Sequence, residues 1–265
     1  LVRNLLAHLP ITDQEALAKV STASTQNADA YLQLVRARSH LRAGNPVEAK
    51  HALQNALMLD PDMGEARGLL AQAHMDLLSG SLSGAGQRIA EARLMIGASP
   101  LSRPEQQVEI ISTLFEDGAE AALSSAQDLV AGHPSDADGH ATLAWILTFL
   151  GEHEQAAKVL AVATRLNPLS PASYHTIEAE LQFATGQDDA ALASADRAIA
   201  MDPLAQRAGL IRVAALANSG KFDEASIALQ ALAKRDSHLD SQAVTELLPY
   251  TDPAAVQRIL TGLRL

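Results

Sequence analysis

The stretch that decides the fold runs from Ala141 to Pro168 and reads ATLAWILTFLGEHEQAAKVLAVATRLNP. Apolar residues follow the i, i+3, i+4, i+7 spacing of one helix face in each half: Leu143, Ile146, Leu147 and Leu150, then Ala156, Val159, Leu160 and Ala163. Gly151 separates the halves, and Pro168 closes the stretch because proline cannot continue a helix interior. The pattern predicts two helices joined by a short turn, which is a helical hairpin.

The same arrangement recurs along the chain. A small residue follows each turn: Ala49, Ala85, Ala122, Ala156, Ala191 and Ala225. Consecutive members lie 34 to 37 residues apart, so that the step from 49 to 85, for example, is 36. Glycines suited to a left-handed helix C-cap stand before most of them: Gly44, Gly118, Gly151, Gly186 and Gly220. We therefore expect the alanines where the two helices of each hairpin cross, because a larger side chain would push the helices apart.

The predicted fold class is all-α, an α-α superhelix of about six helix-turn-helix repeats with a C-terminal capping helix pair. The repeats are expected at 30–63, 64–100, 103–136, 137–170, 171–205 and 206–238. Residues 1–29 would form an N-terminal helix that ends a preceding segment, and 239–265 the capping helices. Extra residues at Ser79–Gly84 and a loose stretch at Ser99–Pro104 mark where a bend in the array is expected.

Composition limits the function classes. The net charge of −11 argues against direct nucleic-acid binding, which needs a basic face. The chain has no cysteine, no apolar run of membrane-spanning length and no visible signal peptide. These features favour the cytoplasm and no membrane contact, with the periplasm as the alternative if a leader was removed. Because the sequence begins with Leu1, we expect a piece of a longer protein or a processed one.

No catalytic or cofactor motif is present, and the prediction is a protein that is not an enzyme and needs no cofactor or metal. Nine histidines are scattered through the chain. His40 and His74 hold corresponding places in two first helices, where filling the hairpin seam is favoured over metal ligation. The acidic groups at the turns suit the positive ends of helix dipoles better than a catalytic pair of carboxylates.

The glycine, alanine and proline positions resemble those of the tetratricopeptide repeat over about residues 28–238. In 137–170 the resemblance covers Leu143, Ala144, Gly151, Ala156, Leu160, Ala163 and Pro168. It implies a solenoid that binds a peptide or partner protein on its concave face, lined by the first helix of each unit.

The flanks resemble a narrower group, bacterial signalling proteins in which a TolB-like segment joins tetratricopeptide repeats to an output domain. The stretches that carry this resemblance are Asn27–Tyr31, Arg36–Arg38, Ala56–Pro61 and Leu248–Arg264. In such proteins the output domain is a class III adenylate cyclase or a winged-helix DNA-binding domain. No catalytic or DNA-reading residue of either output domain is present in this sequence.

The register of the repeat predicts which residues point into the concave groove: Arg38, Arg42, Gln107, Trp145, Thr148, Glu180, Phe183 and Arg207. Trp145 is the only tryptophan, a residue type enriched in binding hot spots. The alternative is that Trp145 packs between adjacent helices. The arginines could pair with a carboxylate of a bound peptide or with nearby glutamates.

The leading functional hypothesis is a protein–protein interaction module that binds a peptide or partner protein in this groove and regulates an attached signalling output domain. The alternative is a structural module that self-associates as a homodimer. Asp252 and Pro253 predict the start of a last helix, as N-cap and first helical residue. That helix would cover the open end of the solenoid or dock on another subunit.

Overall fold

The computed structural model describes residues 25–43, 45–77, 85–98, 100–235, 244–245 and 248–263. Within these ranges the chain forms thirteen helices and no strand. The bounds are α3 (Ala28–Arg42), α4 (Pro46–Leu59), α5 (Gly64–Leu77), α6 (Ala85–Met95), α7 (Arg103–Glu116), α8 (Ala119–Gly132), α9 (Ala137–Phe149), α10 (His153–Leu166), α11 (Ala172–Ala184), α12 (Asp188–Met201), α13 (Gln206–Asn218), α14 (Phe222–Arg235) and α16 (Pro253–Gly262).

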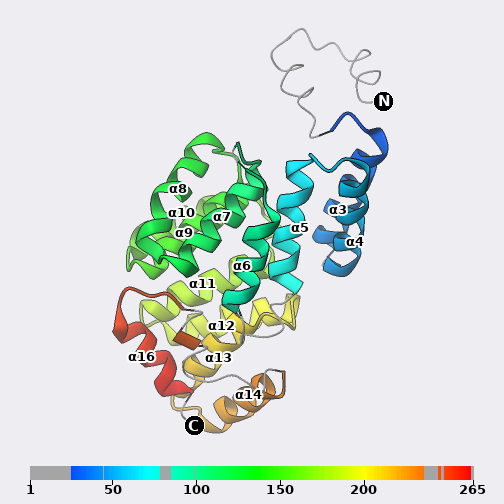
Figure 1. Cartoon of the computed structure of the whole chain (residues 1–265). Coiled ribbons are helices and arrows are strands. Elements are labelled where there is room, and N and C mark those ends of the chain that lie inside the picture. Colours follow the sequence, from blue (N-terminus) through cyan, green and yellow to red (C-terminus); the bar gives the residue numbers. More distant parts are fainter. Residues whose placement is uncertain are drawn as a thin grey trace.

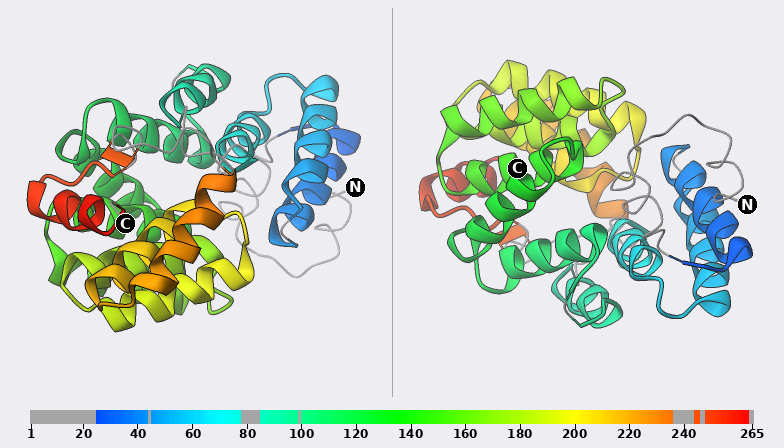
Figure 2. Two further views of the ribbon diagram at one scale, coloured as in Figure 1. Left: turned by 90° about the horizontal axis from the view of Figure 1, so that it is seen from below. Right: turned by 90° about the horizontal axis from the view of Figure 1, so that it is seen from above.

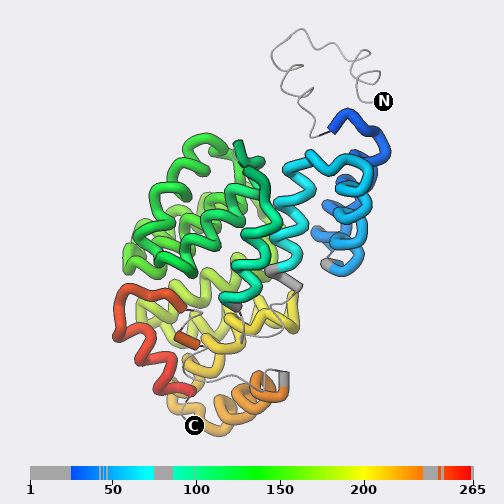
Figure 3. The backbone as a smooth tube through the Cα atoms, viewed as in Figure 1, coloured from blue at the N-terminus to red at the C-terminus, as the bar shows by residue number. Residues whose placement is uncertain are grey.

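The helices α3 to α14 form six consecutive hairpins, which we call units one to six (Figure 1). Each first helix packs against its second helix, and from unit two onward each first helix also contacts the first helix of the next unit. The tube trace follows this succession from hairpin to hairpin (Figure 3). The predicted all-α superhelix of repeated hairpins is confirmed.

Small residues lie at the helix crossings, as the sequence predicted. Ala156 and Ala191 have no exposed surface, and neither do Ala49, Ala122 and Ala225. Gly151, Gly186 and Gly220 adopt positive φ between 75° and 81°, in the left-handed region that suits a turn after a helix. Alanine crossings and glycine turns together set the short distance and the sharp reversal that each hairpin needs.

The buried core is interrupted near units two and three. Among the described residues, one cluster covers α3, α4 and the start of α5, from Ala30 to Ala66. A small second cluster of Ala71, Ala92 and Val108 joins α5, α6 and α7. A third and much larger one extends from Ile110 to Ile259. Two views at right angles to Figure 1 show the α3–α4 hairpin apart from the closely stacked later units (Figure 2). A bend was expected in this region; Ser79–Gly84 lies outside the described residues.

Glu105, at the start of α7, joins units two and three. Its carboxylate accepts hydrogen bonds from the Ser102 backbone N–H at 2.9 Å, the Gly97 backbone N–H at 2.9 Å and Arg67 Nε at 3.1 Å. Burial by itself would raise the pKa of Glu105, but these donors together lower it below its usual value. The ionised carboxylate therefore ties α5, the α6–α7 loop and α7 together.

Of the expected N-terminal helix at 1–29, residues 1–24 lie outside the described residues, and 28–29 belong to α3. The first of the two expected capping helices also falls largely outside them, since only 244–245 and 248 are described there. The second is present as α16, with Asp252 as N-cap accepting from the Ala254 backbone N–H at 2.8 Å. Among the described helices α16 packs mainly on α13, the first helix of unit six, and not on α14 at the end of the array.

Candidate binding surface on the first helices of units four to six

Three first helices bring one side chain each to a common point: Trp145 from α9, Glu180 from α11 and Arg207 from α13. First helices are covered by the units before and after them, and every residue from 141 to 149 in α9 is buried. A polar side chain on this face must therefore find its partners inside the protein.

Glu180 and Arg207 form an ion pair across α11 and α13. Glu180 has no exposed surface, while the Arg207 side chain keeps 23%. Arg207 Nε donates to Glu180 Oε1 at 2.8 Å, and Nη2 donates to the second carboxylate oxygen. This two-point geometry matches the planar guanidinium to the carboxylate, which compensates the cost of removing both charges from water.

Trp145 is held from several sides. The Arg207 guanidinium carbon lies 3.8 Å from the centre of the Trp145 ring, a cation–π contact. Phe115 of α7 and Phe149 of α9 have ring centres 5.5 Å and 5.4 Å from it. Trp145 is 6% exposed, and its Nε1 is buried without a hydrogen-bond partner in the part of the chain that the structure describes. Trp145 was expected either to point into the groove or to pack between adjacent helices. In the structure it packs between helices.

Residues 248–263, which we call the closing segment, lie over this cluster. The Tyr250 ring meets Phe149 edge-on, with ring centres 4.8 Å apart. Thr251 donates twice to the Phe149 carbonyl oxygen, from its backbone N–H at 2.9 Å and from Oγ1 at 3.0 Å. Phe149 ends α9, and the last carbonyls of a helix lack partners within the helix. The closing segment therefore acts as a C-cap for a helix about a hundred residues earlier in the chain.

The Tyr250 hydroxyl is buried and has no hydrogen-bond partner among the described residues. Burial raises the pKa of Tyr250 well above its usual value; the nearby Glu180 carboxylate raises it further, and Arg207 opposes them. The phenol is therefore neutral in the folded protein and lies within the field of the buried ion pair.

Arg258 is the second anchor of the closing segment. Its Nη1 donates to the Phe183 carbonyl oxygen and its Nη2 to Asp188 Oδ1, each at 2.8 Å. The guanidinium carbon also lies 4.5 Å from the centre of the Phe183 ring. A positive charge near the end of α11 complements the negative end of the helix dipole.

Gly262 lets α16 approach α13. A Cβ built on Gly262 would lie 2.8 Å from Ala214 Cα and 3.3 Å from Ala214 Cβ. Because the first of these atoms is backbone, no side-chain rotation could relieve the contact. Figure 1 shows α16 beside α13.

The surface brings several kinds of chemical group together. It combines aromatic edges, a carbonyl acceptor at each of two helix ends, an acidic side chain and a buried ion pair. In the part of the chain that the structure describes, no group of three or more His, Asp or Glu side chains is arranged to hold a metal ion. Nor does any helix there have the length and apolar character needed to cross a membrane.

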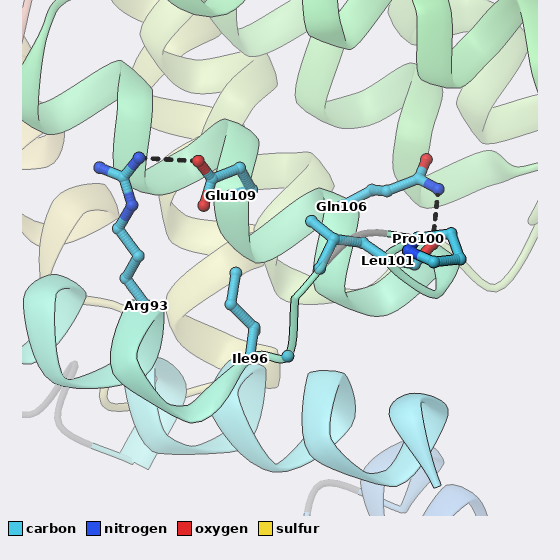
Figure 4. A pocket seen from close by; sticks show the side chains of 7 residues that line it. Arg93, Ile96, Pro100, Leu101, Gln106 and Glu109 are labelled. Carbon is cyan, nitrogen blue, oxygen red and sulfur yellow. Dashed lines mark hydrogen bonds and ion pairs between the residues drawn. The ribbon is translucent and has the colours of Figure 1, made fainter. Parts of the chain in front are cut away.

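An open hollow of about 520 Å³ lies between α6 and α7 (Figure 4). Arg93 points across it to Glu109, with a distance of 2.7 Å between Nη2 and Oε1, and also pairs with Glu116. Gln106 on the far side donates to the Leu101 carbonyl at 2.9 Å. The polar groups around this hollow satisfy one another and do not converge on its interior.

Comparison with known proteins bears on the repeats. Residues 40–108, from the end of α3 into α7, match the family model of the tetratricopeptide repeat. This stretch has the sequence of tetratricopeptide repeats. The matched residues end before the candidate surface, which begins at Phe115. No curated protein matches the chain.

Solved structures, the first two of them of tetratricopeptide repeat proteins, resemble the chain at low identity. A thermophilic protein of Thermus thermophilus has 21% identity and a TM-score of 0.48, covering 71% of this chain and 98% of its own. One from Parabacteroides merdae has 12% identity and a TM-score of 0.46, covering 90% and 100%. PilF of Pseudomonas aeruginosa has 16% and 0.39, covering 78% and 91%. Similarity at this level supports no inference about function.

Five of the eight residues predicted to line the groove lie in or beside the cluster. Trp145, Glu180 and Arg207 form its centre. The Phe183 ring contacts the Arg258 guanidinium. Thr148 is fully buried, and its Oγ1 donates to the Ala144 carbonyl within α9 at 2.9 Å. The arginine at the centre pairs with a nearby glutamate of its own chain.

The other three residues lie elsewhere. Gln107 is buried and accepts from Gln72 Nε2 at 2.6 Å. Arg38 pairs with Glu65 of α5. The side chain of Arg42 lies outside the described residues. The structure thus does not bring Gln107 and Arg38 to the cluster.

The repeat register did not predict four residues that belong to this surface: Phe115, Phe149, Tyr250 and Arg258. One usable signal was the scarcity of aromatic residues, which make up only 3% of the chain. Three of these four missed residues are aromatic, and with Trp145 they form a continuous series of ring contacts. Nothing in the repeat pattern marks Arg258, because it belongs to the segment after the last repeat.

Proposed function

We propose that this chain is a protein–protein interaction module and that the first-helix face of units four to six binds a peptide segment of a partner protein. Tetratricopeptide repeats generally mediate protein–protein interactions. The single observation that carries the proposal is that this face already holds a peptide segment, residues 250–258, through both main-chain and side-chain contacts.

The face suits a peptide for a physical reason. The Phe149 and Phe183 carbonyl oxygens are fixed hydrogen-bond acceptors at the C-terminal ends of α9 and α11. The aromatic rings of the same two residues contact the bound segment as well. Fixed acceptors and rigid aromatic walls bind a flexible segment without themselves losing much conformational freedom.

The experiment is a selection of displayed peptides on the purified chain, followed by calorimetry with the selected peptides. It is run on wild type and on Gly262→Leu, in which α16 is forced away from α13. We expect selected peptides to bind at least about tenfold more weakly when Trp145→Ala is added, because the cluster loses its central ring. Leu94→Ala, at a side chain 86% exposed on α6, is the matched control and should leave the affinity unchanged.

Circular dichroism of each variant shows whether the helices persist. The proposal fails if no peptide is enriched on either protein. It also fails if a well-folded Trp145→Ala variant binds the selected peptides as tightly as its parent.

We also propose that binding regulates an attached signalling output domain. What supports this is the resemblance of Asn27–Tyr31 and Leu248–Arg264 to bacterial signalling proteins with such domains. Reading the coding sequence upstream of Leu1 tests it directly. An open reading frame without a cyclase or winged-helix domain would remove this part of the proposal and leave the binding module intact.

A further inference from the structure

Resting on the proposed function, we infer that the closing segment is an intramolecular ligand of this face. An external partner carries an aromatic residue followed eight positions later by arginine, as Tyr250 and Arg258 do, and binds only by displacing the closing segment. Such a partner is a peptide segment recognised at two seats, which we call the aromatic seat and the arginine seat.

The closing segment is held both by directional contacts and by the core: Leu248 and Ile259 belong to the large core cluster, and Tyr250, Leu260 and Leu263 pack against it. In α16 the buried residues are Ala255, Ile259 and Gly262, of which only Ile259 has a large side chain. Its directional contacts are to carbonyl oxygens and a carboxylate on α9, α11 and α12. Release of the closing segment would therefore uncover part of the large cluster, which a displacing partner must cover again.

The arginine seat selects a guanidinium. It consists of the Phe183 carbonyl oxygen, Asp188 Oδ1 and the face of the Phe183 ring. A planar guanidinium can donate to both acceptors while stacking on the ring, whereas a lysine ammonium cannot do all three. The Asp188 carboxylate also supplies charge complementarity to a basic partner.

The aromatic seat is filled imperfectly by the closing segment. The Tyr250 ring packs edge-on against Phe149, but its hydroxyl is buried with no hydrogen-bond partner among the described residues. A buried unpartnered hydroxyl weakens docking relative to a ring without one. A partner with phenylalanine at this position therefore binds the seat better than the closing segment does, which makes displacement possible.

The covalent link makes the competition strong. A tethered segment has a high effective concentration at its seat, so an external peptide meets a mostly occupied face. Its apparent affinity is the intrinsic affinity multiplied by the fraction of molecules in which the face is free. Variants that release the closing segment therefore raise the affinity for the same external peptide.

The test uses a fluorescent synthetic peptide with the sequence of residues 248–263 and the full chain. Fluorescence anisotropy measures its binding to wild type and to two release variants, Gly262→Leu and Arg258→Ala. We expect both release variants to bind the peptide at least about tenfold more tightly than wild type. Because the two variants release the closing segment in different ways, one suffices if the other does not fold.

Variants of the seats and of the peptide complete the test. Asp188→Asn, added to Gly262→Leu, should weaken binding, and so should Arg258→Lys in the peptide. Tyr250→Phe in the peptide should strengthen it. Leu94→Ala added to Gly262→Leu is the matched control and should change nothing.

Three results would overturn the inference. They are equal affinity of the peptide for wild type and a folded release variant, no binding to either release variant, or a wild-type chain that light scattering shows to be a dimer with exchanged closing segments. If the peptides selected by display still bind, the proposed function stands without the inference. If those peptides also fail to bind, both are wrong.

Discussion

Arg207 of α13 contacts side chains of two other first helices, α9 and α11. It forms a two-point ion pair with Glu180 of α11, and its guanidinium stacks on Trp145 of α9. A lysine could not make this pair of contacts, because its ammonium is a point charge without a plane. The contacts of this one guanidinium therefore join α13 to α11 and to α9.

Removing Glu180 tests the buried pair. Glu180→Ala should lower the free energy of unfolding by about 3 kcal/mol, because Arg207 would be left largely buried without its counter-ion. Urea denaturation followed by circular dichroism gives the value. Glu154→Ala is the control: its side chain is 87% exposed in the pair with Lys158, and its loss should leave the stability almost unchanged. Equal effects of the two substitutions would contradict a special role of the buried pair.

Tyr250 predicts a dependence of stability on alkaline pH. Its pKa is raised in the folded state, mainly by burial, so the folded protein keeps the phenol proton where the unfolded chain loses it. The contribution of this group to stability is complete below the unfolded pKa of about 10 and is lost as the pH rises above it.

Tyr250→Phe should remove that part of the pH dependence. Near neutral pH the variant should be at least as stable as wild type, because it loses a buried hydroxyl that has no hydrogen-bond partner among the described residues. Above about pH 10 its advantage should grow. The measurement is chemical denaturation of both proteins across this range, and a constant difference would show that Tyr250 ionises alike in both states.

At the scale of helices, the sequence predicts the hairpins well because their determinants are local. Each helix boundary depends on a glycine, a proline or a capping side chain within a few residues, and each crossing on an alanine at fixed spacing. Gly118, Gly151, Gly186 and Gly220 all adopt positive φ, as expected of turns after helices. Ala156 and Ala191 are fully buried, as expected of crossing positions.

The helix on which α16 packs could not be predicted from a local sequence pattern. The sequence indicates an apolar face at Val256, Ile259, Leu260 and Leu263, but an apolar face does not specify its partner. In the structure Ala255, Ile259 and Gly262 are buried, and Leu260 and Leu263 pack half-buried against the large core cluster. The contacts of Thr251 with Phe149 and of Arg258 with Phe183 join residues more than seventy positions apart. Such pairings depend on the curvature of the whole array.

The contact between α5 and α7 depends on a glycine that the repeat pattern does not mark. A Cβ on Gly68 would lie 2.5 Å from the Glu105 backbone nitrogen and 2.7 Å from the Pro104 carbonyl carbon. Gly68→Ala should therefore separate the two helices and destabilise the protein by about 1–3 kcal/mol. Gly86→Ala in α6 is the matched control, because nothing lies within 4 Å of the new methyl group and alanine favours helix. Thermal unfolding of both variants distinguishes a close crossing from a general effect of adding a methyl group.

At the scale of the whole molecule, the interrupted core divides the array. In a solenoid each unit is stabilised mainly by its neighbours, so a gap between core clusters weakens the coupling across it. The α3–α4 hairpin has its own cluster around Leu34 and Leu53, separate from the large cluster of the later units. The candidate surface lies entirely within the large cluster and its covering segment. We therefore expect the first hairpin to open without disturbing that surface.

Hydrogen exchange measured by mass spectrometry tests this division. Leu53→Ala removes a fully buried side chain of α4, at a cost of about 2–5 kcal/mol. Exchange should accelerate in α3 and α4 and stay unchanged in α9, α11 and α13, because local opening of one hairpin leaves the other cluster intact. Leu210→Ala, at an equally buried position in α13, should instead accelerate exchange across units four to six. If Leu53→Ala accelerated exchange throughout the array, the two clusters would unfold as one unit, and the first hairpin would be as strongly coupled to the binding surface as the later repeats are.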